Sequence, residues 1–111
     1  MDLSLLIASD TADCVIVDPK TNKATNIVVT CYGVYSDEYQ EAIKKRESAK
    51  DSSSMELLID LTVGWKNLSY EGKKLEFNRE NALLVYSMKG MVVKNQVEAF
   101  ILEQNNFLPK R

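Results

Sequence analysis

The sequence contains no histidine among its 111 residues. Histidine is the usual general base near neutral pH, the partner of serine and cysteine nucleophiles, and a common zinc ligand. Its absence removes Ser-His-Asp and Cys-His nucleophilic systems and most zinc sites, whatever fold the chain adopts. We therefore expect a protein that is not an enzyme, and we assign no catalytic residue.

Glycine is scarce as well, with four in the chain. Neither of the glycine-rich phosphate-binding motifs, GxxxxGKS/T or GxGxxG, occurs. Asp10, Asp13 and Asp18 are close in sequence, but their spacing matches no calcium loop. The sequence thus predicts neither a cofactor nor a metal ion. A small acid-based enzyme, such as a nuclease, remains a third class of function and would need acids gathered around a divalent metal.

The chain has two cysteines, Cys14 and Cys31, each in a run of β-branched or aromatic residues. A structural zinc site usually takes four cysteine or histidine ligands, so two thiols do not suggest one. We expect both to be small, buried and reduced side chains. A turn centred between Asn22 and Lys23 would place them directly opposite each other, which keeps a disulfide open as an alternative.

An excess of positive charge is also lacking, since the net charge is -2 and the isoelectric point is about 5.2. Nucleic-acid-binding proteins normally present a basic face or stripe. The nearest candidate, Lys44, Lys45 and Arg46, is flanked by Glu41 and Glu47. We interpret it as the solvated face of a helix. We expect no nucleic-acid partner.

Long apolar runs are missing. The apolar start of the chain has no positively charged region before it and ends at Asp10, which does not fit a signal peptide. No run approaches the roughly 20 apolar residues that a membrane-spanning helix needs. We therefore expect no membrane association and a location in the cytoplasm, where the chain is made.

What the sequence does contain is the material for one folded domain. Hydrophobic residues make up 45% of the chain and charged residues 27%, so it can bury a core. A chain of this length suits one core, and we expect a single domain over residues 1–111. The predicted fold class is α+β, with an N-terminal β-hairpin followed by a small bundle of three to four helices.

The hairpin is predicted over residues 13–32. Residues 14–17 and 25–32 are rich in β-branched side chains, which is typical of strands. Between them, Asp18-Pro19 starts a turn, because proline fixes its own φ and moves the preceding residue out of the helical region. The loop is polar, and we expect it to be exposed.

The helical part is predicted over residues 36–105. Ser36 is a hydroxyl cap followed by two acids, which favours a helix that reaches about Ala49. Residues 51–54 are either a serine-rich break or an exposed stretch of one long helix, and the helix that follows carries Met55, Leu58, Ile59 and Thr62. This helix is expected to end at Gly64, because glycine takes a positive φ without a Cβ clash.

The last third of the chain predicts two further helices. Ser69 to Lys74 reads as a loop with Gly72 at its turn, and residues 75–77 as a short extended piece. Asn78 is a good N-cap for a third helix, Gly90 interrupts the pattern, and a final helix follows. Asp60, which lies between two apolar residues of the second helix, is expected on the solvent side.

Six residues are candidates for binding a partner. Trp65 is the only tryptophan, and it either fills the core or anchors an interface, where tryptophan is enriched. Tyr70 lies in a polar loop and is expected to be exposed. The final helix carries an apolar stripe that either belongs to the core or contacts a partner. The residues of this stripe are Val93, Val97, Phe100 and Ile101.

Several segments, taken in order, resemble the tail assembly chaperones of long-tailed bacteriophages. Residues 17–21 resemble that family's hydrophobic-x-Pro-x-Thr turn, and Ser36-Asp37 with Tyr39 resembles its helix start. Residues 62–68 are similar to its most distinctive element, a Gly-Trp pair that closes a central helix. The other similarities are Gly72, Leu75-Glu76-Phe77-Asn78, Asn81-Ala82, Val97, Phe100 and Asn106-Phe107-Leu108.

The similarity spans nearly the whole chain, with two departures. Asn22 stands where the family has glycine, and Asn78 stands where it has serine. Both substitutions keep the turn and cap chemistry. They leave open a sister family of small phage structural proteins.

The resemblance implies a protein-binding function in the cytoplasm of the bacterial host. Such chaperones keep the helix-rich tape-measure protein soluble and help to recruit tail-tube subunits, and they are not part of the mature virion. The resemblance also implies a homo-oligomer and a longer product made by ribosomal frameshifting, for which the codons of residues 109–111 are a candidate site. The alternative is a small structural virion protein, such as a tail-completion or head-tail joining component.

Overall fold

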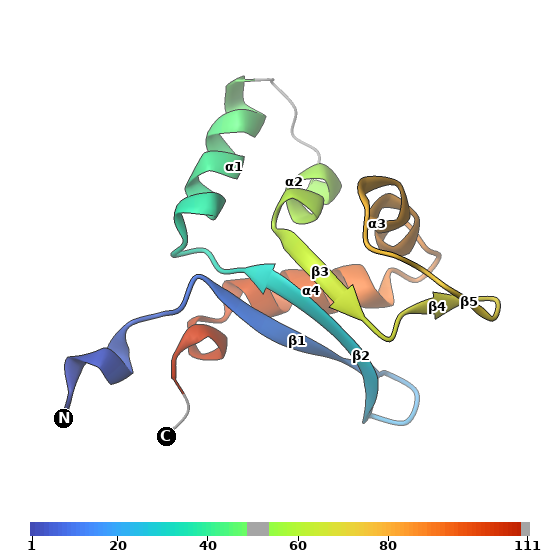
Figure 1. Cartoon of the computed structure of the whole chain (residues 1–111), viewed down its shortest axis with the longest axis horizontal. Coiled ribbons are helices and arrows are strands. Elements are labelled where there is room, and N and C mark those ends of the chain that lie inside the picture. The colour runs from blue at the N-terminus through green and yellow to red at the C-terminus, as the bar shows by residue number, and fades with distance from the viewer. Residues whose placement is uncertain (49–53, 110–111) are drawn as a thin grey trace.

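The chain folds into a three-stranded antiparallel sheet with helices around it. The computed structural model describes residues 1–48 and 54–109. The strand order is β1-β2-β3. In Figure 1 the last long helix, α4, runs behind the sheet, while α1, α2 and α3 lie beyond its β3 side. The strands are β1 (Thr11–Asp18), β2 (Lys23–Tyr32) and β3 (Thr62–Lys66), with a separate pair β4 (Ser69–Tyr70) and β5 (Lys73–Lys74). The helices are α1 (Asp37–Ser48), α2 (Ser54–Asp60), α3 (Arg79–Tyr86) and α4 (Val92–Leu102), with the short 3-10 helices η1 (Leu3–Leu6) and η2 (Gln104–Phe107).

The predicted N-terminal hairpin is confirmed as β1 and β2. Asp18 opens the turn: its carboxylate accepts from Lys20 N at 2.9 Å, and its carbonyl accepts from Asn22 N at 2.7 Å. Asn22 itself has a φ of 60°, a conformation that asparagine tolerates better than most residues. The pairing begins at Asp18 opposite Lys23 and shifts at a bulge between Val15 and Val17.

The predicted start of the first helix is also confirmed. The Ser36 hydroxyl accepts from Tyr39 N at 3.1 Å and donates to the carbonyl of Gly33 at 2.7 Å. Ser36 is buried, so its hydroxyl satisfies two backbone groups where water cannot reach them. The predicted end of this helix near Ala49 lies outside the described residues, as do residues 51–53 of the segment 51–54, whose last residue, Ser54, begins α2.

The prediction that the second helix continues to Gly64 is wrong. Helix α2 ends at Asp60, and the following residues form β3, which pairs with β2 so that Thr30 lies opposite Gly64 and Val29 opposite Trp65. Thr62, Val63 and Trp65 have high strand propensity, and the neighbouring hairpin offers an edge that completes their backbone hydrogen bonds. The Gly-Trp pair therefore lies within a strand and does not close a helix.

The helices pack around this sheet and do not form the clear bundle that the sequence predicts. Helix α4 packs on β1 and β2, and α2 lies between α1 and α3. The α+β class is confirmed. The predicted Asn78 cap is also confirmed, since its side chain accepts from Asn81 N at 2.8 Å. The predicted interruption at Gly90 is confirmed too, because Gly90 has a φ of 91° and lies between α3 and α4. Residues 75–77 form no strand, while β4 and β5 make a small hairpin with Gly72 at its turn.

The core lies between the sheet and α4. Val97 of α4 and Val29 of β2 have no exposed surface, and Ile101 is also buried. Phe100 and Phe107 meet edge to face with ring centroids 5.5 Å apart, which fastens η2 to the end of α4. One cluster of buried side chains thus joins the sheet, all four helices and η2.

Helix α4 is also joined to the edge of β1 by one side chain. The amide of Gln96 accepts from Val17 N at 2.7 Å and donates to Val17 O at 2.7 Å. Both polar groups of a backbone unit at the strand edge are therefore satisfied by one residue. This pair of bonds fixes the position of α4 along the strand.

A buried hydroxyl chain links α2, β3 and α3. Tyr86 of α3 has no exposed surface, and its Oη lies 2.6 Å from Thr62 Oγ1. Since the Thr62 hydroxyl donates to Leu58 O at 2.8 Å, its single proton is used, and Tyr86 is the donor to Thr62. Burial raises the pKa of Tyr86 to about 12, so the phenol stays protonated.

Replacing Tyr86 with phenylalanine is expected to lower the free energy of unfolding by about 1–2 kcal/mol, because it removes one partner of a buried hydrogen bond. Urea denaturation monitored by circular dichroism measures this change. The matched control is Tyr35→Phe, since the Tyr35 side chain is 64% exposed and its change should stay within about 0.5 kcal/mol. Equal losses in the two variants would contradict the role given to the buried hydroxyl chain.

Candidate functional site

The acidic residues do not assemble into a metal site within residues 1–48 and 54–109. There, no group of three or more His, Cys, Asp or Glu side chains is placed to hold an ion. Nor does any helix in this part of the chain have the length and apolar character needed to cross a membrane.

The two cysteines are buried free thiols in the sheet. They are not directly opposite each other, because the hairpin turn and the bulge shift the pairing: Cys14 lies opposite Val29, and Cys31 opposite Ala12. Burial raises the pKa of Cys14 to about 11 and that of Cys31 to about 12. Both thiols are therefore protonated at neutral pH and act as small apolar side chains of the core.

Trp65, a predicted partner-binding residue, is tied into the domain. Its Nε1 donates to Leu75 O at 2.8 Å, and its ring meets Phe77 edge to face with centroids 5.0 Å apart. The indole is half-buried and packs against the core. It fastens the segment after β5 to β3, as a core residue would. Tyr70 of β4, by contrast, is 45% exposed.

The apolar stripe of the last helix faces inward. Val97 and Ile101 are buried, and Val93 and Phe100 are half-buried and packed against the core. Of the six residues predicted to bind a partner, Phe100 lines a larger and more polar pocket and Ile101 lines an apolar one, neither of which sequence reasoning located.

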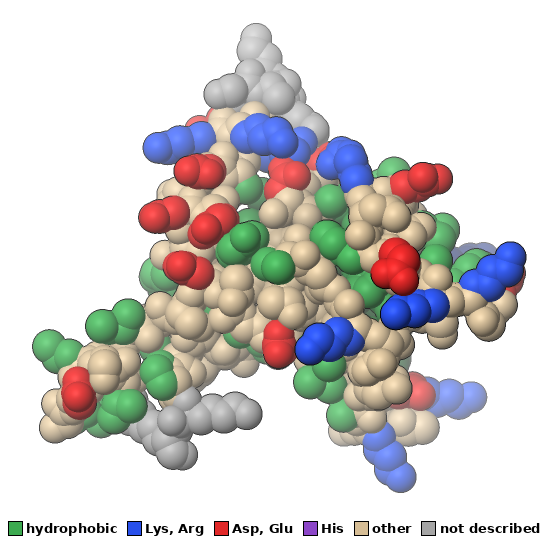
Figure 2. Space-filling view, in the orientation of Figure 1, with side chains coloured by type: hydrophobic (Ala, Val, Ile, Leu, Met, Phe, Trp, Pro, Cys, Tyr) green, Lys and Arg blue, Asp and Glu red, His purple; other side chains and the backbone are tan. Residues whose placement is uncertain are grey.

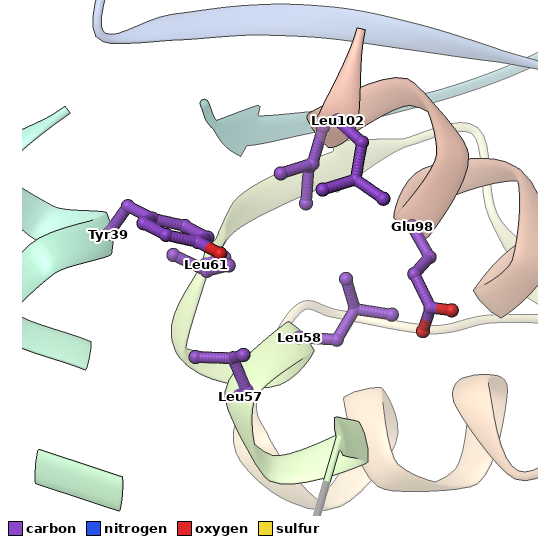
Figure 3. Close-up of a pocket in the computed structure, with 7 residues that line it drawn as sticks. Tyr39, Leu57, Leu58, Leu61, Glu98 and Leu102 are labelled. Carbon is purple, nitrogen blue, oxygen red and sulfur yellow. The ribbon is translucent and has the colours of Figure 1, made fainter. Parts of the chain in front are cut away.

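The apolar pocket lies where α1, α2 and α4 meet (Figure 3). Its volume is about 200 Å³. An apolar cavity of about 150 Å³ holds one benzene molecule, so this one has room for one or two branched aliphatic side chains. We call it the three-helix pocket. Its lining residues are Tyr39, Leu57, Leu58, Leu61, Glu98, Ile101 and Leu102.

The walls of the three-helix pocket are almost entirely apolar. Glu98 is the one charged residue that lines it, and its carboxylate accepts from Lys94 Nζ at 3.0 Å, one turn earlier on α4. Leu102 stands at its margin with 66% of its surface exposed. In Figure 3 the leucine side chains from α2 and α4 point toward a shared space, with the Tyr39 ring on its other side.

A salt bridge between Arg46 and Asp60 sets the distance between two of these helices. The side chains, on α1 and α2, are only 14% and 19% exposed. The prediction that Asp60 faces solvent is therefore wrong, because α1 folds back over this side of α2. A partly shielded, charge-assisted hydrogen bond is stronger than an exposed one, and it holds α1 and α2 together.

Other apolar side chains are exposed elsewhere. Residues 1–7 carry Leu3, Leu6 and Ile7 at 73%, 48% and 65% exposure. Figure 2 shows apolar side chains gathered at the lower left, where Figure 1 places this N-terminal segment. On α3, Leu83 and Leu84 are about half exposed. A second, more polar pocket is lined by Ala12, Asp13, Phe100, Asn105, Asn106 and Leu108.

Comparison with known proteins gives no relative: no protein-family model matches the chain, and neither does a curated protein or a solved structure.

The buried thiols predict a loss of stability in alkaline solution. Their pKa values are raised on folding above the usual value near 8.5, so the stabilisation is complete below about pH 8.5 and is lost as the pH rises toward 11. Urea midpoints measured at pH 7, 9 and 10 should therefore fall with pH. In a Cys14→Ala variant the fall should be shallower, and an unchanged slope would contradict the assignment.

Proposed function

We propose that this chain is an assembly chaperone that keeps the phage tape-measure protein soluble and helps to recruit tail-tube subunits, through a longer frameshifted product. Two independent observations support the proposal. The first is the ordered resemblance described above, from the Asp18-Pro19 turn to residues 106–108. The second, which carries the binding mechanism, is the accessible apolar three-helix pocket.

The pocket suits one turn of an amphipathic helix. Such a helix presents apolar side chains at i and i+3 or i+4 along one face. The volume of about 200 Å³ accommodates one or two of them. Leu102 is exposed at the margin and is placed to cover the bound side chain from one side. A long helical client has many such turns, so several copies of a small chaperone can cover it.

The charges around the pocket indicate how the client binds. Glu98 is already paired with Lys94, whose side chain is 12% exposed, and the other lining residues carry no charge. Binding in this pocket therefore rests on apolar contact, with a negative heat-capacity change and little dependence on salt. Recognition by sequence-independent apolar contact is what a helix-coating chaperone requires.

The test is co-expression of the chain with the tape-measure protein encoded in the same genome. Wild type should keep the tape measure soluble and co-purify with it. Leu102→Asp should weaken the complex roughly fivefold to thirtyfold, because loss of a packed interface side chain costs about 1–2 kcal/mol. Leu84→Asp is the matched control, since Leu84 is 42% exposed and lies on α3, away from the pocket.

Two results would contradict the proposal. One is an insoluble tape measure with both the short chain and a frameshifted longer product. The other is recovery of the chain from purified virions at the stoichiometry of a structural component, which would favour the tail-completion or head-tail joining alternative. Equal behaviour of Leu102→Asp and wild type would leave the chaperone function standing and remove the pocket as its site.

A further inference from the structure

The N-terminal segment of the sequence, residues 1–7, is an apolar arm without a place in its own core. Met1 is 85% exposed, Leu3 73% and Ile7 65%. No residue of η1 is buried, and the first side chain that packs against the core is that of Ala8. Isolated exposed apolar residues are common, but four of them within seven residues indicate a contact surface.

The arm has a defined shape despite its exposure. The Asp2 carboxylate accepts from Ser4 N at 2.9 Å, and Asp2 O accepts from Leu5 N at 3.1 Å. The backbone hydrogen bond from Ser4 lowers the pKa of the Asp2 carboxyl, so the cap is charged and formed at neutral pH. Ser9 then fixes the base of the arm: its N donates to Phe107 O at 2.7 Å, and its hydroxyl lies 2.8 Å from Thr11 O and 3.0 Å from Phe107 O.

Residues 1–7 do not line the three-helix pocket of their own chain. Figure 1 shows η1 running away from the sheet, on the side opposite α2 and α3. The short 3-10 helix of the arm leaves Leu3 and Leu6 exposed to a neighbouring molecule. Each copy thus carries an apolar arm that needs cover and an apolar pocket that needs an occupant.

We infer that the arm of one copy docks in the three-helix pocket of a second copy, with the side chain of Leu3 or Leu6 as the inserted group. The pocket has room for one or two such side chains and walls of the same apolar character. Exchange is reciprocal, so a two-fold dimer buries two arms and fills two pockets through identical contacts. A single leucine in a small pocket binds weakly, but two linked contacts reinforce each other.

This docking also regulates the client site, an extension that rests on the proposed function. Because the arm and a client helix use the same pocket, the arm covers its apolar walls until a client displaces it. Displacement requires that the client bind the pocket more tightly than the arm does. Free chaperone is thereby protected from non-specific aggregation while it remains available to the client.

The contact is tested directly by crosslinking between two differently tagged chains, one carrying L3C or L6C and the other L102C. Mild oxidation of the mixture should join the two chains at least tenfold more than in the control pair, in which L84C replaces L102C. The native cysteines are buried and protonated and do not compete. Sedimentation velocity of wild type should show a concentration-dependent dimer, and the arm variant L3S/L6S should be monomeric.

Three outcomes would overturn the inference. The first is equal crosslinking to L84C and L102C. The second is a disulfide that forms only within a single chain carrying both L3C and L102C. The third is an L3S/L6S variant that dimerises like wild type. The arm variant changes only exposed positions, so its fold is retained and circular dichroism can verify this. If L3S/L6S is monomeric yet still keeps the tape measure soluble, the arm is needed for the dimer and is not needed for the chaperone function.

Discussion

The packing of α4 on the sheet is the contact on which the rest of the structure depends. Val97 and Ile101 lie against the face that β1 and β2 present, where Cys14, Val29 and Cys31 are buried. A hairpin alone does not bury enough apolar surface to be stable in water. Once α4 covers it, the end of the same helix supplies Glu98, Ile101 and Leu102 to the pocket. The fold and the proposed binding surface therefore share one element.

Local chemistry made the hairpin and the helix starts predictable. Asp18-Pro19, Ser36 and Asn78 act through hydrogen bonds within four residues of themselves, so their effect can be read without knowledge of the fold. Strand β3 could not be predicted in this way, because Thr62–Lys66 becomes a strand only beside β2, more than thirty residues earlier in the chain. A glycine followed by tryptophan fits a helix end or a strand equally well until that neighbour is present.

The pocket was out of reach for a related reason. Its walls come from three helices, and a hydrophobic pattern along one helix does not reveal which apolar residues remain uncovered. The stripe on α4 was correctly identified as apolar, yet most of it is turned to the sheet. The most exposed apolar residue of the helix is Leu102, just beyond the end of the stripe. Leu57 of α2 and Leu61, just after that helix, share the pocket with Tyr39 of α1 and with the end of α4.

The double hydrogen bond between Gln96 and Val17 has a consequence for how this protein can associate. An open strand edge is a template on which another chain can add by backbone pairing, and such addition continues without limit. At Val17 that pairing position is already taken by a side chain from the same molecule. One position on the sheet edge of this chain is thereby closed to fibril growth.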